Sequence, residues 1–600
     1  MTNATCRAAR TGLVLAAFIL AGVLGREAGM AHAEGEAPPA GRTTIYVARK
    51  IVTMEPALPE ARVVAVRDGL VLGLGERIED LSPWLASGDY DVDRRFEHDV
   101  VMPGFIDPHL HPMMAAVLLP THFITPEDWD LPRGRMHGVR TPAGYREALG
   151  RAIAETPDDG RPFITWGHHA HWHGPVDRAL LDELAPERAV IVWQRSFHEL
   201  TFNTKALERL GLGSEASFAE AIEAPGIEPA HADFAAGHVS ETAMKAILPR
   251  MAPFVLTPEH LARGLSSLRQ MMLAAGVTTI ADMATGIFAP FEQEARTLRH
   301  TFGGPDASAR ILLVPTAAGL VAEYGSVDAA VERLHALAPE LTSANVLIDD
   351  RVKLLADGAF FALAMRMNPP GYTDGHEGKW ITAPAELRRL ARAYWSKGFT
   401  IHCHVNGDEG LDVVLDLLES LQRETPRVAH RFTLEHLGYS TEAQSRRIAE
   451  LGAFVSAQPN YLYLLGHAYG ESGLGRDRAA QISRLGSLER KGVTVALHSD
   501  TTMAPVAPLF LAWQAATRET LEGGVLTPSE RLSLDAALRA ITIDAATVIG
   551  REAEIGSIAA GKRADFAVLD RDPYDVGAKG LAKIRVRGVV FGGRPVAATP

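Results

Sequence analysis

The chain has 600 residues, of which 47% are hydrophobic and 22% are charged, and its formal net charge is −13 at pH 7. These proportions are those of a globular protein that can bury a large core in one large or several smaller domains. The negative charge argues against nucleic acid or an anionic membrane as a partner, because both call for basic patches.

Residues 1–33 have the pattern of a secretory signal peptide. Two arginines precede an apolar stretch, Leu13 to Leu24, and the small-residue sequence Ala31-His32-Ala33 follows it. We expect cleavage after residue 33 and a periplasmic or secreted protein. A permanent anchor is the weaker interpretation, because the stretch is about half of the ~20 residues that span a bilayer. Cleavage would remove Cys6 and leave only Cys403, so we expect no internal disulfide.

Short strand-like segments, separated by Gly or Asp, occur at both ends of the mature chain. We predict that residues 44–99 and 549–600 form one composite β-sandwich domain from both termini. The segments are residues 44–48, 62–66, 69–74, 564–570 and 584–591.

The middle of the chain, residues 100–548, alternates strand-like and helix-like stretches, which is typical of a parallel α/β architecture. Eight strand candidates predict a (β/α)8 TIM barrel, whose active site lies at the carboxyl ends of the strands. About 170 residues separate the first two strands, so we expect a large insertion after strand 1, at about 113–260, over the barrel mouth. The strand candidates lie near residues 100–106, 277–282, 310–315, 351–355, 399–404, 431–435, 453–457 and 493–498.

Candidate metal ligands follow several of these strands. In His109-Leu110-His111 the two histidines stand at i and i+2 of a strand end, so both imidazoles point to one spot. Imidazole is a suitable ligand for zinc, iron, nickel or copper. Any single one of the 23 histidines is more often a surface or hydrogen-bonded core residue. Ligands at the ends of several strands together favour a metal site. The others are Lys353, His404, His436 and Asp500.

Seven motifs in a fixed order extend this pattern. They are residues 103–111 (PGFIDPHLH), 276–283 (GVTTIADM), 352–358 (VKLLADG), 404–408 (HVNGD), 435–436 (EH), 499–500 (SD) and 556–565 (GSIAAGKRAD). In this order and spacing they resemble the amidohydrolase superfamily, and more narrowly the amidohydrolase-3 branch that includes N-substituted formamide deformylases. The resemblance covers almost the whole mature chain.

The resemblance implies a set of metal ligands. His109, His111 and Asp500 would hold one divalent metal, with Zn²⁺ the expected ion. His404 and His436 would bind a second metal or complete the first site, so one and two ions per chain both stay open.

Lys353 has two interpretations. In many superfamily members a lysine at this place reacts with carbon dioxide, and the resulting carbamate bridges two metals. The alternative is an ordinary lysine paired with Asp357 or another carboxylate. A charged lysine within a barrel strand would carry a large desolvation penalty if it stayed unpaired.

The expected reaction is hydrolysis of a C–N bond in an amide other than a peptide. A bound metal lowers the pKa of water from 15.7 to ~7 and so supplies hydroxide at neutral pH. Asp500 would act as general base and then acid, and His436 or His404, where not a metal ligand, would stabilise the oxyanion. A metal-dependent esterase, lactonase or cyclic amidase is an alternative. A periplasmic binding protein without turnover is a further alternative, disfavoured because Asp500 is present.

The insertion is expected to select a small-molecule substrate. If Trp166 to Gly174 is extended, His169, His171 and His173 share one face, which suits either a further metal or, preferably, a substrate wall. His198 is a candidate substrate contact or a structural residue at a helix start. Tyr461 and Tyr463 line either the pocket or the core. A homodimer stays open.

Three departures from the family pattern lie near the expected site. They are Ala281 beside the aspartate of the second strand, His498 where a glycine is usual, and Asn406 with Glu409 in the fifth-strand motif. The substrate of a relative therefore cannot be transferred to this chain.

Overall fold

The computed structural model describes residues 41–597 except 87 and 225–226. The predicted signal peptide and Cys6 lie outside these residues, so the prediction of export stays a prediction. Within the described residues, no helix is both long and apolar enough to cross a membrane.

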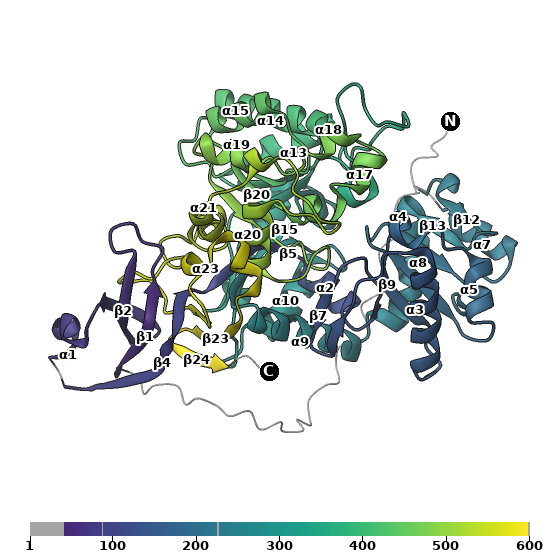
Figure 1. Ribbon diagram of the computed structural model, residues 1–600. Coiled ribbons are helices and arrows are strands. Elements are labelled where there is room, and N and C mark those ends of the chain that lie inside the picture. Colours follow the sequence, from purple (N-terminus) through teal and green to yellow (C-terminus); the bar gives the residue numbers. More distant parts are fainter. Residues whose placement is uncertain (1–40, 87, 225–226, 598–600) are drawn as a thin grey trace. The chain divides into compact units, whose positions relative to one another are not determined.

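Strands from both ends of the described chain form one mixed sheet in the order β24-β23-β22-β4-β1-β2-β3. Strand β4 joins the two ends, because it pairs parallel with β1 and antiparallel with β22 (Figure 1, purple and yellow). Neighbouring residues of β1, Ile45 and Tyr46, enter two different apolar clusters, since side chains alternate between the faces of a strand. A two-layered sandwich stays a prediction. The strands are β1 (Thr43–Val52), β2 (Glu60–Arg67), β3 (Leu70–Gly75), β4 (Tyr90–Pro103), β22 (Phe566–Leu569), β23 (Val586–Phe591) and β24 (Arg594–Ala597).

Nine parallel strands lie in the middle of the described chain; seven of the eight candidates match one of them, and the first candidate overlaps β5 only at its end. They lie in two sheets, of order β16-β15-β14-β5 and β17-β18-β19-β20-β21. A parallel bridge between Thr316 and Lys353 links the sheets on one side. On the other side the Asp500 amide donates to the His109 carbonyl at 3.0 Å. The strands are β5 (Phe105–Leu110), β14 (Val277–Thr285), β15 (Arg310–Pro315), β17 (Arg351–Leu355), β18 (Thr400–Val405), β19 (Thr433–His436), β20 (Phe454–Ala457) and β21 (Val495–Leu497), with β16 (Val346–Ile348) as an additional short strand.

The predicted bounds of the first barrel strand are wrong. Residues 100–103 end β4 in the terminal sheet, and β5 begins at Phe105. Gly104 lies between the two strands, and a larger residue would not fit there, because a Cβ would lie 2.1 Å from Thr278 Oγ1. Pro108 lacks an N–H group, which β5 tolerates because it is the outer strand of its sheet.

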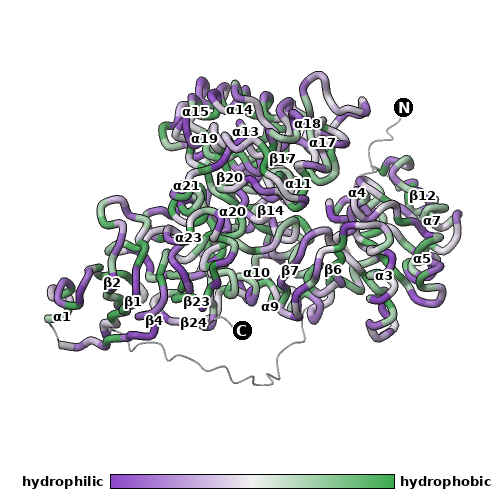
Figure 2. Tube along the Cα trace, in the orientation of Figure 1, coloured by the Kyte–Doolittle hydropathy of each residue, from purple (hydrophilic) through white to green (hydrophobic). Residues whose placement is uncertain are grey.

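Helices cover the parallel strands, and their apolar side chains recur every three to four residues. Helix α13 buries Leu387, Leu390, Ala391 and Tyr394, and Figure 2 shows both hydrophobic and hydrophilic residues in the region of α13 and α14. The helices are α10 (Phe291–Phe302), α11 (Ala317–Tyr324), α12 (Val327–Leu341), α13 (Pro384–Ser396), α14 (Asp408–Glu424), α15 (Glu442–Leu451), α16 (Asn460–Leu465), α17 (Ala468–Glu471), α18 (Arg476–Ala479), α19 (Leu485–Arg490), α20 (Pro508–Thr517), α21 (Leu534–Arg539), α22 (Ile543–Val548) and α23 (Pro573–Gly580); α1 (Ser82–Leu85) lies near the N-terminal strands.

The residues between β5 and β14 form an α/β unit of their own, with a sheet of order β12-β13-β11-β10-β9-β6. Helix α2 follows β5, and helix α9 precedes β14. The two helices pack closely against each other, because Gly264 of α9 has no side chain to keep the Ala116 backbone of α2 away. The predicted bounds of the insertion stay a prediction. The strands are β6 (His122–Phe123), β7 (Trp129–Leu131), β8 (Gly134–Met136), β9 (Phe163–His168), β10 (Val190–Gln194), β11 (Glu199–Phe202), β12 (Ala232–Asp233) and β13 (His238–Ser240). The helices are α2 (Pro112–Leu118), α3 (Pro142–Glu155), α4 (Ala170–His173), α5 (Arg178–Leu184), α6 (Thr204–Arg209), α7 (Glu215–Ile222), α8 (Met244–Val255) and α9 (Pro258–Ala274).

Candidate metal centre and active site

Polar side chains from β5, β17, β18, β19 and β21 meet where these strands end. The strands are parallel within each sheet. Their carboxyl ends therefore lie on one face, where TIM-barrel enzymes build their active sites. The side chains are His109, His111, Lys353, His402, His404, Glu435, His436, His498 and Asp500.

The three residues predicted to hold one metal lie together. His111 Nε2 is 3.1 Å and His109 Nε2 is 3.7 Å from Asp500 Oδ1. One ligand atom from each of the three lies within 4.8 Å of the others. Asp500 has a φ of 54°, and its amide donates to the His109 carbonyl. This turn aims the carboxylate at both imidazoles.

A second group consists of His109, His436 and His498, whose ligand atoms also lie within 4.8 Å of one another. His436 Nδ1 is 3.2 Å from His498 Nε2. The predicted ligand His404 lies beside this group, with its ring centroid 4.5 Å from that of His436. Its Nε2 accepts from the Asn406 side chain at 3.1 Å. The ligand role of His404 stays a prediction.

Glu435 belongs to the 435–436 motif and contacts two of the imidazoles, a role that was not predicted from the sequence. It is fully buried, and its two oxygens accept from His109 Nδ1 and His402 Nδ1, each at 2.7 Å. Burial opposes the charge of Glu435, but Lys353 and the His402 hydrogen bond outweigh it and lower the pKa of this carboxyl to about 2. The ionised carboxylate therefore fixes the tautomers of His109 and His402, leaving each Nε2 without a proton.

Lys353 is buried, and its Nζ has no hydrogen-bond partner in the described part of the chain. The alternative in which Asp357 pairs with it is wrong. The Asp357 carboxylate instead accepts from the backbone amides of Arg366, Asn406 and Gly407 at 2.8–2.9 Å. Burial lowers the pKa of Lys353, and the Glu435 and Asp500 carboxylates oppose this shift.

The donor chemistry fits a divalent transition metal. Imidazole and carboxylate are the ligands of catalytic zinc sites. Burial lowers the pKa of His109 and His436 well below the usual value and that of His498 to about 4, so these imidazoles are neutral, as ligands must be. Burial also acts on His111, but Asp282 and Asp500 outweigh it and raise its pKa to about 9, so a bound ion would have to displace the proton of His111. Buried nitrogens without a partner, His402 Nε2 and Lys353 Nζ, are further signs of an ion site.

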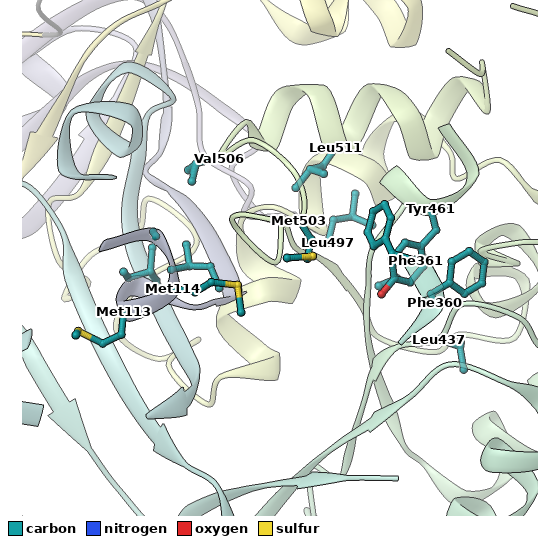
Figure 3. Packing of buried hydrophobic residues seen from close by; sticks show 14 of the residues in the cluster. Met113, Met114, Phe360, Phe361, Leu437, Tyr461, Leu497, Met503, Val506 and Leu511 are labelled. Atoms are coloured by element: carbon teal, nitrogen blue, oxygen red, sulfur yellow. The ribbon is translucent and has the colours of Figure 1, made fainter. Parts of the chain in front are cut away.

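Aromatic side chains pack beside the histidines. The predicted substrate contact Tyr461 is buried at the start of α16, stacks on Phe360 at 4.2 Å and lies 6.4 Å from the His436 ring. Figure 3 shows Tyr461, Phe360 and Phe361 grouped together. Tyr463 instead packs against Phe510 at 5.2 Å, which is the core-packing alternative.

The other two predicted substrate contacts, His169 and His198, lie in different surroundings from each other. His169 is buried, and its Nε2 has no partner in the described residues. Burial and then the charge of Arg195 lower the pKa of His169. Arg195 is fully buried, pairs with Glu127 and donates to the Met503 carbonyl at 2.7 Å. His198 is 39% exposed and lies 3.2 Å from Glu241. The substrate roles of His169 and His198 stay predictions.

The alternative prediction of a further metal at the histidine-rich segment is wrong, because the segment is not extended. Residues 170–173 form α4. His173 Nδ1 accepts from the His169 amide at 3.0 Å, and His173 Nε2 donates to the Val139 carbonyl at 2.8 Å. These hydrogen bonds use both nitrogens of His173, so the segment offers no shared face of three free imidazoles.

Comparison with known proteins agrees with this geometry. The model of the amidohydrolase family matches residues 97–597. The N-substituted formamide deformylase of Arthrobacter pascens is 27% identical over 499 residues, covering 81% of this chain and 86% of that protein. Protein LONG AFTER FAR-RED 3 of Arabidopsis thaliana is 24% identical and covers 90% and 89%. An uncharacterised metal-dependent hydrolase from Pyrococcus horikoshii has the same fold, with a TM-score of 0.68, 20% identity, and coverage of 90% and 99%.

The protein thus has a mixed α/β fold of the TIM-barrel type, with a His/Asp cluster that could hold a divalent metal. The chain belongs to the amidohydrolase family, in the branch that the sequence motifs indicated, and is a hydrolase.

Proposed function

We propose that the protein is an exported, metal-dependent amidohydrolase that hydrolyses a C–N bond, other than a peptide bond, in a small-molecule amide. The observation that carries this proposal is the convergence of His109, His111 and Asp500 at strand ends in a chain of this family. The amide class is supported by the similarity to the Arthrobacter deformylase. Export is supported by the sequence pattern of residues 1–33.

The histidines and Asp500 have distinct tasks. His109, His111 and Asp500 would hold one ion, which when bound supplies an activated water and polarises the scissile carbonyl. Asp500 takes the proton of the attacking water and delivers it to the leaving nitrogen. The non-ligating member of the pair His404 and His436 stabilises the oxyanion.

Lys353 is proposed to be carbamylated. Its Nζ would form a bond to the carbon of CO2 and release one proton, giving an anion that can join two ions. The buried, unpartnered Nζ and its lowered pKa support this step, because the uncharged amine is the nucleophile. ¹³C NMR of protein equilibrated with ¹³CO2 should show a carbamate resonance that is absent from the Lys353→Met variant.

The finer architecture is part of the same proposal. The eight strands close into a barrel, the terminal strands form a composite sandwich, and the insertion lies over the mouth and contacts the substrate through His169 and His198. Tyr461 is the substrate contact on the barrel side, supported by its position beside His436.

Hydrolysis of a panel of small amides, esters and lactones by zinc-loaded protein tests the function. We expect amide hydrolysis, and the Asp500→Asn variant should lose on the order of 10²–10⁴-fold in kcat. Equal turnover by that variant at full metal content would remove Asp500 from the mechanism. Activity restricted to esters or lactones would replace the amidase proposal with the alternative.

A further inference from the structure

We propose that His498 is a metal ligand of this chain, donating its Nε2 to the same divalent transition cation that His109 binds, together with His436. His109 has only its Nε2 free, because its Nδ1 is hydrogen-bonded to Glu435, so both histidine groups concern one ion. The inference rests on the proposed function, which places an ion at this face of the barrel. It adds a residue outside the ligand set expected from the sequence.

The hydrogen bonds of His498 leave the correct nitrogen free. Its Nδ1 is 2.7 Å from Ser456 Oγ and 3.8 Å from Glu435 Oε2. With the Ser456 hydroxyl accepting, the proton of His498 lies on Nδ1; the nearby Glu435 carboxylate favours this tautomer because it carries negative charge. Nε2 then keeps its lone pair and faces the neighbouring imidazole of His436.

The spacing of the facing nitrogens suits a shared ion. His498 Nε2 and His436 Nδ1 are 3.2 Å apart. Two nitrogens that each bind zinc at 2.0–2.1 Å in tetrahedral geometry lie about 3.3 Å apart. With the nitrogen of His109, all three ligand atoms fall within 4.8 Å of one another, and all three residues are buried.

The backbone around His498 is held on both sides, so the imidazole is pre-organised. The His498 amide donates to the Ala457 carbonyl of β20 at 3.0 Å, and two residues later the Asp500 amide donates to the His109 carbonyl of β5. His498 has no exposed surface, so water does not compete for its Nε2. Ligands held on rigid strand ends in this way bind with little reorganisation.

Metal titration of the His498→Gln variant tests the proposal. We expect its zinc affinity, measured by competition with a chromophoric chelator, to fall by about 100-fold or more, since loss even of a residue that only orients a ligand costs 10–100-fold. The visible spectrum of the cobalt-substituted variant should also change. Ser456→Ala, which removes only the anchor of Nδ1, should lose roughly tenfold in affinity and keep the cobalt spectrum.

Anomalous diffraction from zinc-loaded native protein gives a second, variant-independent test, should the variant fail to fold. We expect the ion about 2.0–2.1 Å from His498 Nε2. An ion bound at His109, His111 and Asp500 with His498 remote, or an unchanged affinity and cobalt spectrum in the folded variant, would overturn this inference alone. Failure of the native protein to bind zinc at all would overturn the proposed function with it.

Discussion

Replacing Glu435 by Gln would test whether a buried carboxylate prepares the imidazoles for the metal. Glu435 accepts two hydrogen bonds of 2.7 Å, from His109 Nδ1 and His402 Nδ1. A glutamine has one acceptor oxygen and one NH2 group. The glutamine oxygen can therefore accept from one imidazole, while its NH2 group faces the N–H group of the other. That second imidazole must change its tautomer or lose its hydrogen bond.

The expected size of the effect follows from these contacts. Loss of a residue that orients a ligand typically weakens metal binding by 10–100-fold, or about 1.4–2.7 kcal/mol. Loss of one buried hydrogen bond to a charged group should also lower the free energy of unfolding of the metal-free protein by about 1.5–3 kcal/mol.

Zinc competition and urea denaturation of native protein and Glu435→Gln measure the two effects separately. Glu530→Gln is a matched control, because Glu530 is also buried and accepts from the Ser487 amide at 2.7 Å and from Arg484 at 2.9 Å. The control should lose stability and keep the native zinc affinity. Native zinc affinity in folded Glu435→Gln would refute the reasoning.

Three further predictions concern stability. Arg195→Ala leaves the Glu127 carboxylate buried without its partner and should cost about 3–5 kcal/mol in urea unfolding; Glu127→Gln added to it should restore part of the loss, and a fully stable single variant would contradict the pairing. Removing the ion with a chelator should lower the Tm, and added zinc should restore it. At a free zinc concentration of 100 times Kd, binding should raise the free energy of unfolding by about 2.7 kcal/mol. An unchanged Tm would contradict an ion bound to the folded protein. Burial lowers the pKa of His173 to about 3 and also lowers that of His260. Both imidazoles are neutral in the folded protein and take up a proton on unfolding below pH 6.5. The free energy of unfolding should therefore fall between pH 6.5 and 5, by up to ~1.4 kcal/mol per pH unit for each proton taken up. A free energy of unfolding that stays constant over this range would contradict the prediction.

The sequence was sufficient for most of the central fold, because its strands are short buried apolar runs bounded by Gly and polar residues. Residues 277–285, for example, are buried throughout, as expected of a strand covered on both faces. The boundary at Gly104 was missed because residues 100–110 form one largely apolar run in the sequence, while the close approach of Gly104 is to Thr278, more than 170 residues away in the chain. Residues 346–348 were missed because a three-residue strand carries little periodicity.

The site could be predicted only where spacing encodes geometry. His109 and His111 share a direction because they are two residues apart on a strand end, and His402 with His404 repeats that signal. Glu435 and His436 are adjacent and should point in opposite directions. His436 has a φ of 73°, which turns its side chain to the face that Glu435 already occupies. The proximity of His498 to His436 arises from the pairing of β19, β20 and β21, which no local pattern reveals.

The metal content of protein purified without chelators tests the central claim most directly. The account predicts about one ion per chain, or about two with a carbamylated Lys353, and a loss of amide hydrolysis that follows the loss of metal. Full activity in protein that contains no metal would contradict it.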